Sequence, residues 1–147
     1  MNTQMQDYFF VKKNNRLEKI DYSTLIYVKG MRGYMQLVTE SQVYFVLNTI
    51  EEVQNHLPPE LFCRIHKSYI VALKRVQCFD NWKIILEPLP GEKQYSELAN
   101  RRELPVGRAF RKRLRESVVI IPNRMNKYVK KVLAEADFLM EYGHDDE

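Results

Sequence analysis

The sequence predicts a mainly β protein with one short helix in its body and a further helix at its C-terminus. Short runs rich in Tyr, Phe, Val and Ile recur over residues 8–106, which is typical of strands. Asn, Gly and Pro residues, which favour turns, separate these runs. From Pro122 onwards the apolar residues change to a helical spacing.

The chain begins with a predicted β-hairpin. Asn14 and Asn15 lie between the strand-like residues 8–12 and 16–20, and asparagine tolerates the left-handed conformation of a tight turn. The sequence then predicts three more strands, at 25–29, 34–39 and 42–46, with Gly30 and Gly33 in the loop between the first two.

A short helix is predicted next. Asn48 or Thr49 can cap it, and Pro58 and Pro59 end it. Its apolar face consists of Ile50, Val53 and Leu57. Further strands are predicted at 61–65, 67–71, 75–79, 83–87 and 104–106. The polar residues 92–103 resist assignment, and Arg108 to Glu116 has a helical or turn-like pattern.

The C-terminal residues form a predicted helix with a heptad-like apolar stripe of Met125, Val129, Val132, Ala136 and Leu139. Basic residues precede acidic ones along it, so two such helices packed antiparallel would bring opposite charges together. A homodimer through this helix is therefore one hypothesis, and docking of the helix onto its own domain is the alternative. The expected division is a domain at 8–116 and a helical extension at 117–147.

Composition indicates a soluble globular chain of 147 residues, with 45% hydrophobic and 29% charged residues. Apolar runs reach only five residues, whereas a spanning helix needs about 20, so we expect no membrane segment and a cytoplasmic location. The net charge is +4, and residues 101–115 carry seven basic side chains against one acid, Glu103. Such a run attracts polyanions, although a solvated helix face would have the same composition.

Two cysteines, Cys63 and Cys78, lie in apolar strand-like contexts and are predicted to be buried, reduced thiols. An enzyme is not expected. His66 and Ser68 would share one face of a strand, as a base and a nucleophile could. No third orienting group and no Gly-rich nucleophile turn accompany them. The sequence lacks the metal-ligand patterns HxxxH and CxxC and the phosphate-binding loops, so no catalytic residue, metal or cofactor is predicted.

Two segments carry the strongest functional signal. In Leu61–Leu73, apolar anchors alternate with a donor-rich cluster of Arg64, His66, Lys67 and Ser68. In Glu103–Leu114, Pro105 and Gly107 define a turn that places Arg108 at the start of a basic helix.

These segments resemble the LytTR-type DNA-binding domain, the output domain of many bacterial response regulators. The resemblance rests on Phe62-x-Arg-Ile-His-x-Ser-Tyr-Ile-Val71, on Leu104-Pro-Val-Gly-Arg108, and on Tyr27-Val-x-Gly-x-x-x-Tyr34 upstream, and it covers about residues 8–116. It implies an elongated stack of small antiparallel sheets with one short helix, in which loops rather than a recognition helix contact the major grooves of DNA. Residues 88–103 are longer than the family pattern, and Arg101 and Arg102 there could extend the DNA surface.

The resemblance places base contacts near Tyr34, at Lys67, and at Gly107 or Arg108. Arginine can bind guanine O6 and N7 with two hydrogen bonds, and lysine can reach guanine or a phosphate. Phosphate contacts, which set register and affinity, are assigned to Arg64, His66, Arg111, Lys112 and Arg113. Three of the candidate residues have structural alternatives. His66 could be a packed strand histidine, Tyr34 could lie at the edge of the core, and Gly107 could shape the fold without touching DNA.

The predicted function is sequence-specific binding of double-stranded DNA by a bacterial transcriptional regulator. The alternative is a small basic β module that binds RNA or a protein partner. Only seven residues precede the first strand, so no receiver domain is expected within the chain, and a separate partner could supply the signal.

Overall fold

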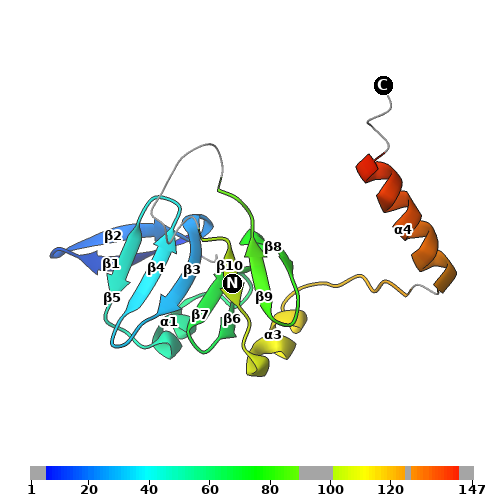
Figure 1. Cartoon of the computed structure of the whole chain (residues 1–147). Coiled ribbons are helices and arrows are strands. Elements are labelled where there is room, and N and C mark those ends of the chain that lie inside the picture. The colour runs from blue at the N-terminus through cyan, green and yellow to red at the C-terminus, as the bar shows by residue number, and fades with distance from the viewer. Residues whose placement is uncertain (1–5, 90–100, 125–126, 143–147) are drawn as a thin grey trace, which may run out of the picture.

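The computed structural model describes residues 6–89, 101–124 and 127–142, with the backbone alone described for 137–142. Strands and short helices alternate through the first two ranges, and a longer helix follows in the third (Figure 1). The strands are β1 (Tyr8–Lys13), β2 (Arg16–Asp21), β3 (Leu25–Gly30), β4 (Met35–Thr39), β5 (Val43–Val46), β6 (Phe62–His66), β7 (Tyr69–Ala72), β8 (Val76–Phe79), β9 (Lys83–Leu86) and β10 (Glu103–Pro105). The α-helices are α1 (Ile50–His56), α3 (Arg111–Glu116) and α4 (Lys127–Tyr142), and the 3-10 turns are η1 (Tyr22–Thr24), η2 (Leu73–Arg75) and η3 (Arg108–Phe110).

The strands form three small antiparallel sheets. A five-stranded sheet has the order β5-β4-β3-β7-β6, a three-stranded sheet has the order β10-β9-β8, and β1 pairs with β2. The mainly β fold predicted from the sequence is confirmed, with α3 as a second short helix within the body. Of the long segment 88–103, residues 90–100 lie outside the described residues.

The core has two halves on opposite faces of the five-stranded sheet. Successive side chains of a strand point to opposite faces. Tyr27 and Val71 therefore pack with the three-stranded sheet and α3, whereas Val28 and Ile70 pack with the hairpin and α1. All four side chains are almost fully buried, and β3 and β7 thus hold the layers together.

Local sequence signals account for the hairpin and for α1. Asn14 and Asn15 have φ values of 52° and 62°, as a two-residue hairpin turn requires. Thr49 caps α1 by accepting a hydrogen bond from the Glu52 backbone N–H at 3.1 Å. Asn48 donates to the Glu52 carboxylate at 2.9 Å, and this hydrogen bond is the largest cause of the lowered pKa of Glu52.

The prediction that both cysteines are buried is wrong for Cys78. Cys63 is buried, and burial raises the pKa of its thiol, but Cys78 is exposed on β8. β8 is an edge strand, and its register with β9 shifts between Val76 and Cys78. The shift leaves Gln77 and Cys78 both facing solvent, which an apolar run in the sequence cannot reveal. Both thiols are free.

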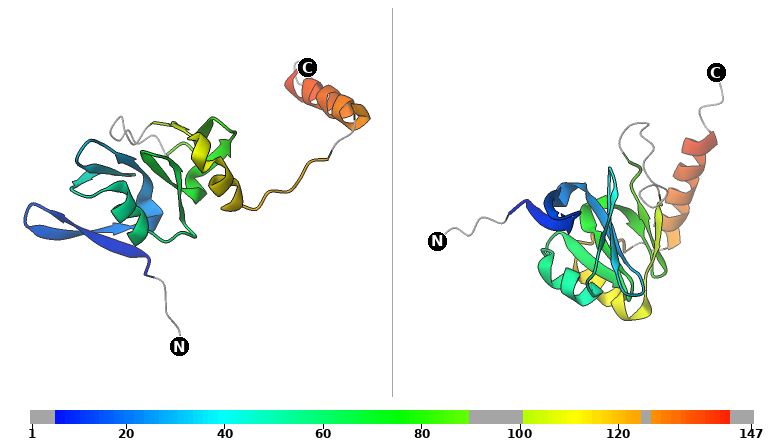
Figure 2. Two further views of the ribbon diagram at one scale, coloured as in Figure 1. Left: turned by 90° about the horizontal axis from the view of Figure 1, so that it is seen from below. Right: turned by 90° about the vertical axis from the view of Figure 1, so that its left-hand side faces the viewer.

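The predicted C-terminal helix is confirmed as α4, which Figure 1 and the left view of Figure 2 show apart from the sheets. Its stripe residues Val129 and Val132 are 38% and 44% exposed. Met125 and the side chain of Leu139 lie outside the described part of the helix. Within the described ranges, no helix is both long and apolar enough to span a bilayer.

Candidate nucleic-acid interface

Three loops of the two larger sheets meet at one end of the molecule, the lower end in Figure 1. They are the β3–β4 loop at residues 31–34, the β6–β7 turn at Lys67 and Ser68, and the β10–η3 loop at residues 106–107. The backbone N–H of Gly30 donates to Ser68 O at 2.7 Å, and that of Gly107 donates to Ile65 O at 2.8 Å. These two hydrogen bonds place the three motifs that the sequence singled out side by side.

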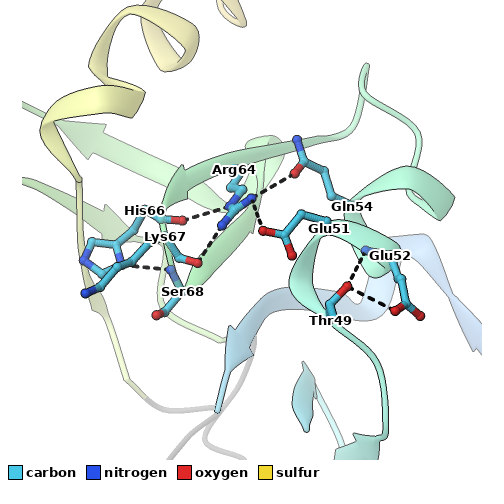
Figure 3. Close-up of polar contacts among 8 residues, drawn as sticks. All are labelled: Thr49, Glu51, Glu52, Gln54, Arg64, His66, Lys67 and Ser68. Atoms are coloured by element: carbon cyan, nitrogen blue, oxygen red, sulfur yellow. Dashed lines mark hydrogen bonds and ion pairs between the residues drawn. The ribbon is translucent and has the colours of Figure 1, made fainter. Parts of the chain in front are cut away.

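Arg64 holds the β6–β7 turn from within (Figure 3). Its guanidinium donates to Lys67 O at 2.8 Å and to His66 O at 3.3 Å. It also reaches Glu51 and Gln54 of α1, at 3.3 and 3.4 Å, and its side chain is only 13% exposed. The Arg64 guanidinium thus supports the turn and ties it to α1.

His66 packs within the same turn. Its Nδ1 accepts a hydrogen bond from the Ser68 backbone N–H at 3.0 Å (Figure 3). The His66 ring also meets the Tyr69 ring edge-on, with 5.6 Å between the ring centroids. Partial burial lowers the pKa of His66, and the positive charges of Lys67 and Arg64 lower it further. The neutral ring is therefore favoured. Its Nδ1 engages the backbone of Ser68, so it is not available as a base for the Ser68 hydroxyl in this arrangement.

Lys67 and Arg108 are the exposed cations of the two motif loops. Lys67 lies at the tip of the β6–β7 turn, and Arg108 starts η3 directly after Gly107. A Cβ atom at Gly107 would lie 3.1 Å from the Phe110 ring and 3.5 Å from His66 Cα. Glycine therefore permits the close approach of the loop that carries Arg108 to the turn that carries Lys67.

The basic helix α3 presents its charges in different ways. Leu114, 1% exposed, anchors it to the core. Arg111 donates to Asn81 O at 2.8 Å, and its guanidinium lies 4.4 Å from the Trp82 ring centroid. Lys112 extends into solvent with its side chain 89% exposed, and Arg113 is exposed with its guanidinium 5.6 Å from the Phe110 ring. α3 therefore adds a basic surface beside the loops.

Tyr34 closes the β3–β4 loop and is half-buried, with its ring 5.9 Å from that of Phe45. The Met31 N–H donates to Tyr34 O at 2.8 Å, and Gly33 has a φ of 88°. Arg32 is exposed in this loop. Tyr34 is thus partly covered by a ring that is itself 60% exposed, while its loop borders the β6–β7 turn.

Sequence reasoning missed Trp82, which is 68% exposed in the β8–β9 turn. Asp80 and Asn81 before it are a turn signal, but nothing in the sequence connects that turn with the basic helix. Arg101 and Arg102 are exposed, and they bond to the domain through Tyr69 and Gln77. In the described ranges, no three His, Cys, Asp or Glu side chains group as metal ligands would.

The chain is similar to a solved DNA-binding domain and to part of a curated transcriptional regulator. The fold resembles a solved Bacillus cereus structure described as the LytTr DNA-binding domain of a methyl-accepting/DNA response regulator. The TM-score is 0.58 at 16% sequence identity, over 77% of this chain and 97% of that one. A curated relative, the CO-responsive transcriptional regulator RcoM of Rhodospirillum rubrum, is 34% identical over 62 residues. That match spans 42% of this chain and only about a quarter of RcoM, 26% of its length.

The family comparison covers most of the body of the molecule. The model of the LytTr DNA-binding domain matches residues 15–119, from the hairpin turn to just beyond α3. All three loops described above fall inside this match. The chain therefore belongs to the LytTr DNA-binding domain family.

Proposed function

We propose that this chain binds double-stranded DNA sequence-specifically through its three adjacent loops and regulates transcription. The observation that carries the proposal is the placement of exposed Lys67 and Arg108 on neighbouring loops joined by backbone hydrogen bonds. Because the backbones of these loops are held in place, binding to a groove has to order only the two long side chains. Membership of a DNA-binding domain family and similarity to part of a transcriptional regulator support the same conclusion.

Different side chains have different proposed roles. Arg108 and Lys67 read base edges in the major groove, where guanine presents two acceptors. Arg111, Lys112 and Arg113 neutralise phosphates and fix the register. Arg64 and His66, assigned to phosphates from the sequence alone, contribute chiefly by holding the turn, because the Arg64 guanidinium and the His66 Nδ1 bond to its backbone. The β3–β4 loop makes the third proposed contact with DNA, near Tyr34.

The decisive experiment selects binding sites from a random duplex library. We expect an enriched sequence, with affinity that falls steeply as salt rises, because phosphate contacts release counterions. Arg108→Ala should cost about 1–3 kcal/mol and relax the preference at one base pair, whereas Lys112→Ala should weaken all sequences alike. Equal losses on selected and random duplexes for both variants would contradict these roles. Tighter binding to single-stranded RNA than to duplex DNA would favour the RNA-binding alternative.

We also propose that the domain at 8–116 acts as the DNA-binding unit and that residues 117–147 pair two copies through α4. Tyr128, Val132 and Leu133 of α4 are 75%, 44% and 44% exposed. The helix begins with basic residues and ends with acidic ones, so a second copy in antiparallel orientation complements its charge. Sedimentation of the full chain should give a dimer, and deletion of residues 122–147 should give a monomer. A monomeric full chain, or a dimer that persists after the deletion, would overturn this pairing.

A further inference from the structure

The β8–β9 turn continues the row of three loops. The Val106 backbone N–H, just before Gly107, donates to Trp82 O at 2.8 Å. Pro105 of β10 pairs with Lys83 of β9 in the same region. The turn therefore lies directly beside the loop that carries Arg108, and the row consists of the β3–β4, β6–β7, β10–η3 and β8–β9 connections.

Side chains on both sides fix this turn. Asp80 Oδ1 accepts hydrogen bonds from the backbone N–H groups of Trp82 and Lys83, at 2.7 and 2.9 Å, and these bonds lower the pKa of Asp80. Arg111 holds Asn81 O at 2.8 Å, and Arg115 holds Asn81 Oδ1 at 2.9 Å. The turn is thus anchored to the basic helix α3 before any ligand arrives.

The same contacts leave a large aromatic surface in water. Trp82 is 68% exposed although its turn is held by several hydrogen bonds. Packing within the domain therefore does not explain why a large aromatic side chain stands at this position. The Arg111 guanidinium lies 4.4 Å from the ring centroid, within the range of a cation–π contact. An exposed indole joined to a cation is suited to packing on a nucleic-acid backbone, where the ring covers sugar carbons and the cation reaches phosphate.

We propose that Trp82 and Arg111 form a fourth DNA contact, in which the indole packs against the sugar–phosphate backbone beside the groove entered by Arg108. This inference rests on the proposed function, because it needs duplex DNA on the loop row. The carboxylates near Trp82 do not repel DNA phosphates strongly, because each of them is already paired. Asp80 is bonded within the turn, and Glu103 pairs with Lys83 at 3.2 Å. Lys83, which follows Trp82 in the chain, and Arg115, which bonds to Asn81, add positive charge near the turn.

Trp82 is the only tryptophan in the chain, so its fluorescence reports this contact directly. The full chain is titrated with a fluorescein-labelled selected duplex of about three helical turns, roughly 30 base pairs. Anisotropy of the label measures binding, while acrylamide quenching, measured with unlabelled duplex, tests access to the indole. We expect quenching to fall at least about twofold at saturation, because the backbone covers a ring that is now in water. Unchanged quenching with a full anisotropy rise would overturn the Trp82 contact and leave the proposed function intact.

A second tryptophan position provides the matched control. In a Trp82→Phe, Phe10→Trp variant, the indole moves to the exposed hairpin position of Phe10, which is 53% exposed in β1. Its quenching should stay constant on DNA binding. Protection of that indole as strong as the protection of Trp82 would mean that quenching does not report a local contact, and it would overturn the inference. No anisotropy change on any duplex, even at low salt, would instead refute the proposed function itself.

Substitutions separate a direct contact from a supporting role. Trp82→Ala should weaken binding at least about fivefold, as loss of an aromatic contact does, with its salt dependence unchanged because no charge is removed. Arg111→Ala should reduce the salt dependence by about one counterion. If Trp82→Ala reduces the salt dependence of binding as much as Arg111→Ala does, the indole acts only by positioning Arg111. If Trp82→Ala binds DNA as tightly as the wild type, the indole makes no contact. Either result would overturn the role of the indole, and circular dichroism checks that the variants are folded.

Discussion

The β6–β7 turn and the β3–β4 loop lie side by side, but they are held in different ways. Arg64, His66 and Gly107 converge on the β6–β7 turn with side-chain hydrogen bonds and close backbone contact. The β3–β4 loop is held by one internal backbone hydrogen bond, from Met31 to Tyr34, and by a left-handed Gly33. The first connection is held by side chains of its own strand β6 together with Gly107 from a distant loop, and the second mainly by its own backbone.

We infer from this difference that the two connections have different roles in the proposed DNA interface. The carbonyls of the β6–β7 turn accept hydrogen bonds from a largely buried guanidinium. Such a turn loses little conformational entropy when it binds a ligand, so it suits contacts that must be placed accurately. A loop with exposed Arg32 and a glycine that has no neighbour within 4 Å of an added Cβ is less constrained by the rest of the domain. The three predictions below test this comparison, starting with the largest expected effect.

Removing Arg64 should damage the β6–β7 turn most. We expect Arg64→Ala to lower the free energy of unfolding by about 1–3 kcal/mol, because the turn carbonyls and the α1 side chains lose a charged donor. Urea unfolding measures this loss, and anisotropy should show weaker DNA binding as well. Arg64→Lys is the control, since lysine retains the charge but lacks the forked donor set. Wild-type behaviour of Arg64→Lys would mean that charge alone suffices and would refute the positioning role.

The β3–β4 loop should respond to backbone strain and not to lost contacts. Gly33→Ala should cost about 1 kcal/mol, because its φ of 88° is unfavourable for a residue with a Cβ, while nothing lies within 4 Å of the added atom. Gly30→Ala is the matched control. Its new Cβ would meet only the flexible end of Met35 at 3.4 Å and Ser68 Cα at 3.6 Å. Denaturant unfolding of both variants should show the larger loss for Gly33. The reverse order would point to crowding between the loops and not to strain.

The smallest effect should come from the protonation of His66. Because the folded protein lowers the pKa of His66 below its ordinary value of 6.5, the unfolded chain binds a proton first as pH falls. The stability that the neutral His66 ring contributes is complete when the pH is above its ordinary pKa of 6.5. It is lost as the pH falls through the lower pKa of the folded protein. Protonation at Nδ1 would also remove the acceptor for the Ser68 N–H. The pH dependence of the unfolding midpoint should therefore be steeper for the wild type than for His66→Gln, and equal slopes would count against this coupling.

Much of the fold and the outline of the site could be predicted from the sequence, because they depend on local chemistry. The Asn14–Asn15 turn, the Thr49 cap and the spacing of the strand runs are properties of a few neighbouring residues. The three motifs also pointed to loops that the structure brings together. The direct roles of the nine candidate DNA-binding residues remain predictions for binding experiments.

What the sequence alone determined is the order and type of most elements, a donor-rich cluster around Lys67, and the place of Arg108 at the start of a basic helix. Only the tertiary structure decided that Arg64 supports a turn from inside, that Cys78 faces solvent, and that Trp82 lies under Arg111. Each of these depends on residues far apart in the chain or on a register shift at a sheet edge. Arg111 and Trp82 are separated along the chain by β9 and β10, and only the packing of α3 against the sheets brings the guanidinium and the indole together.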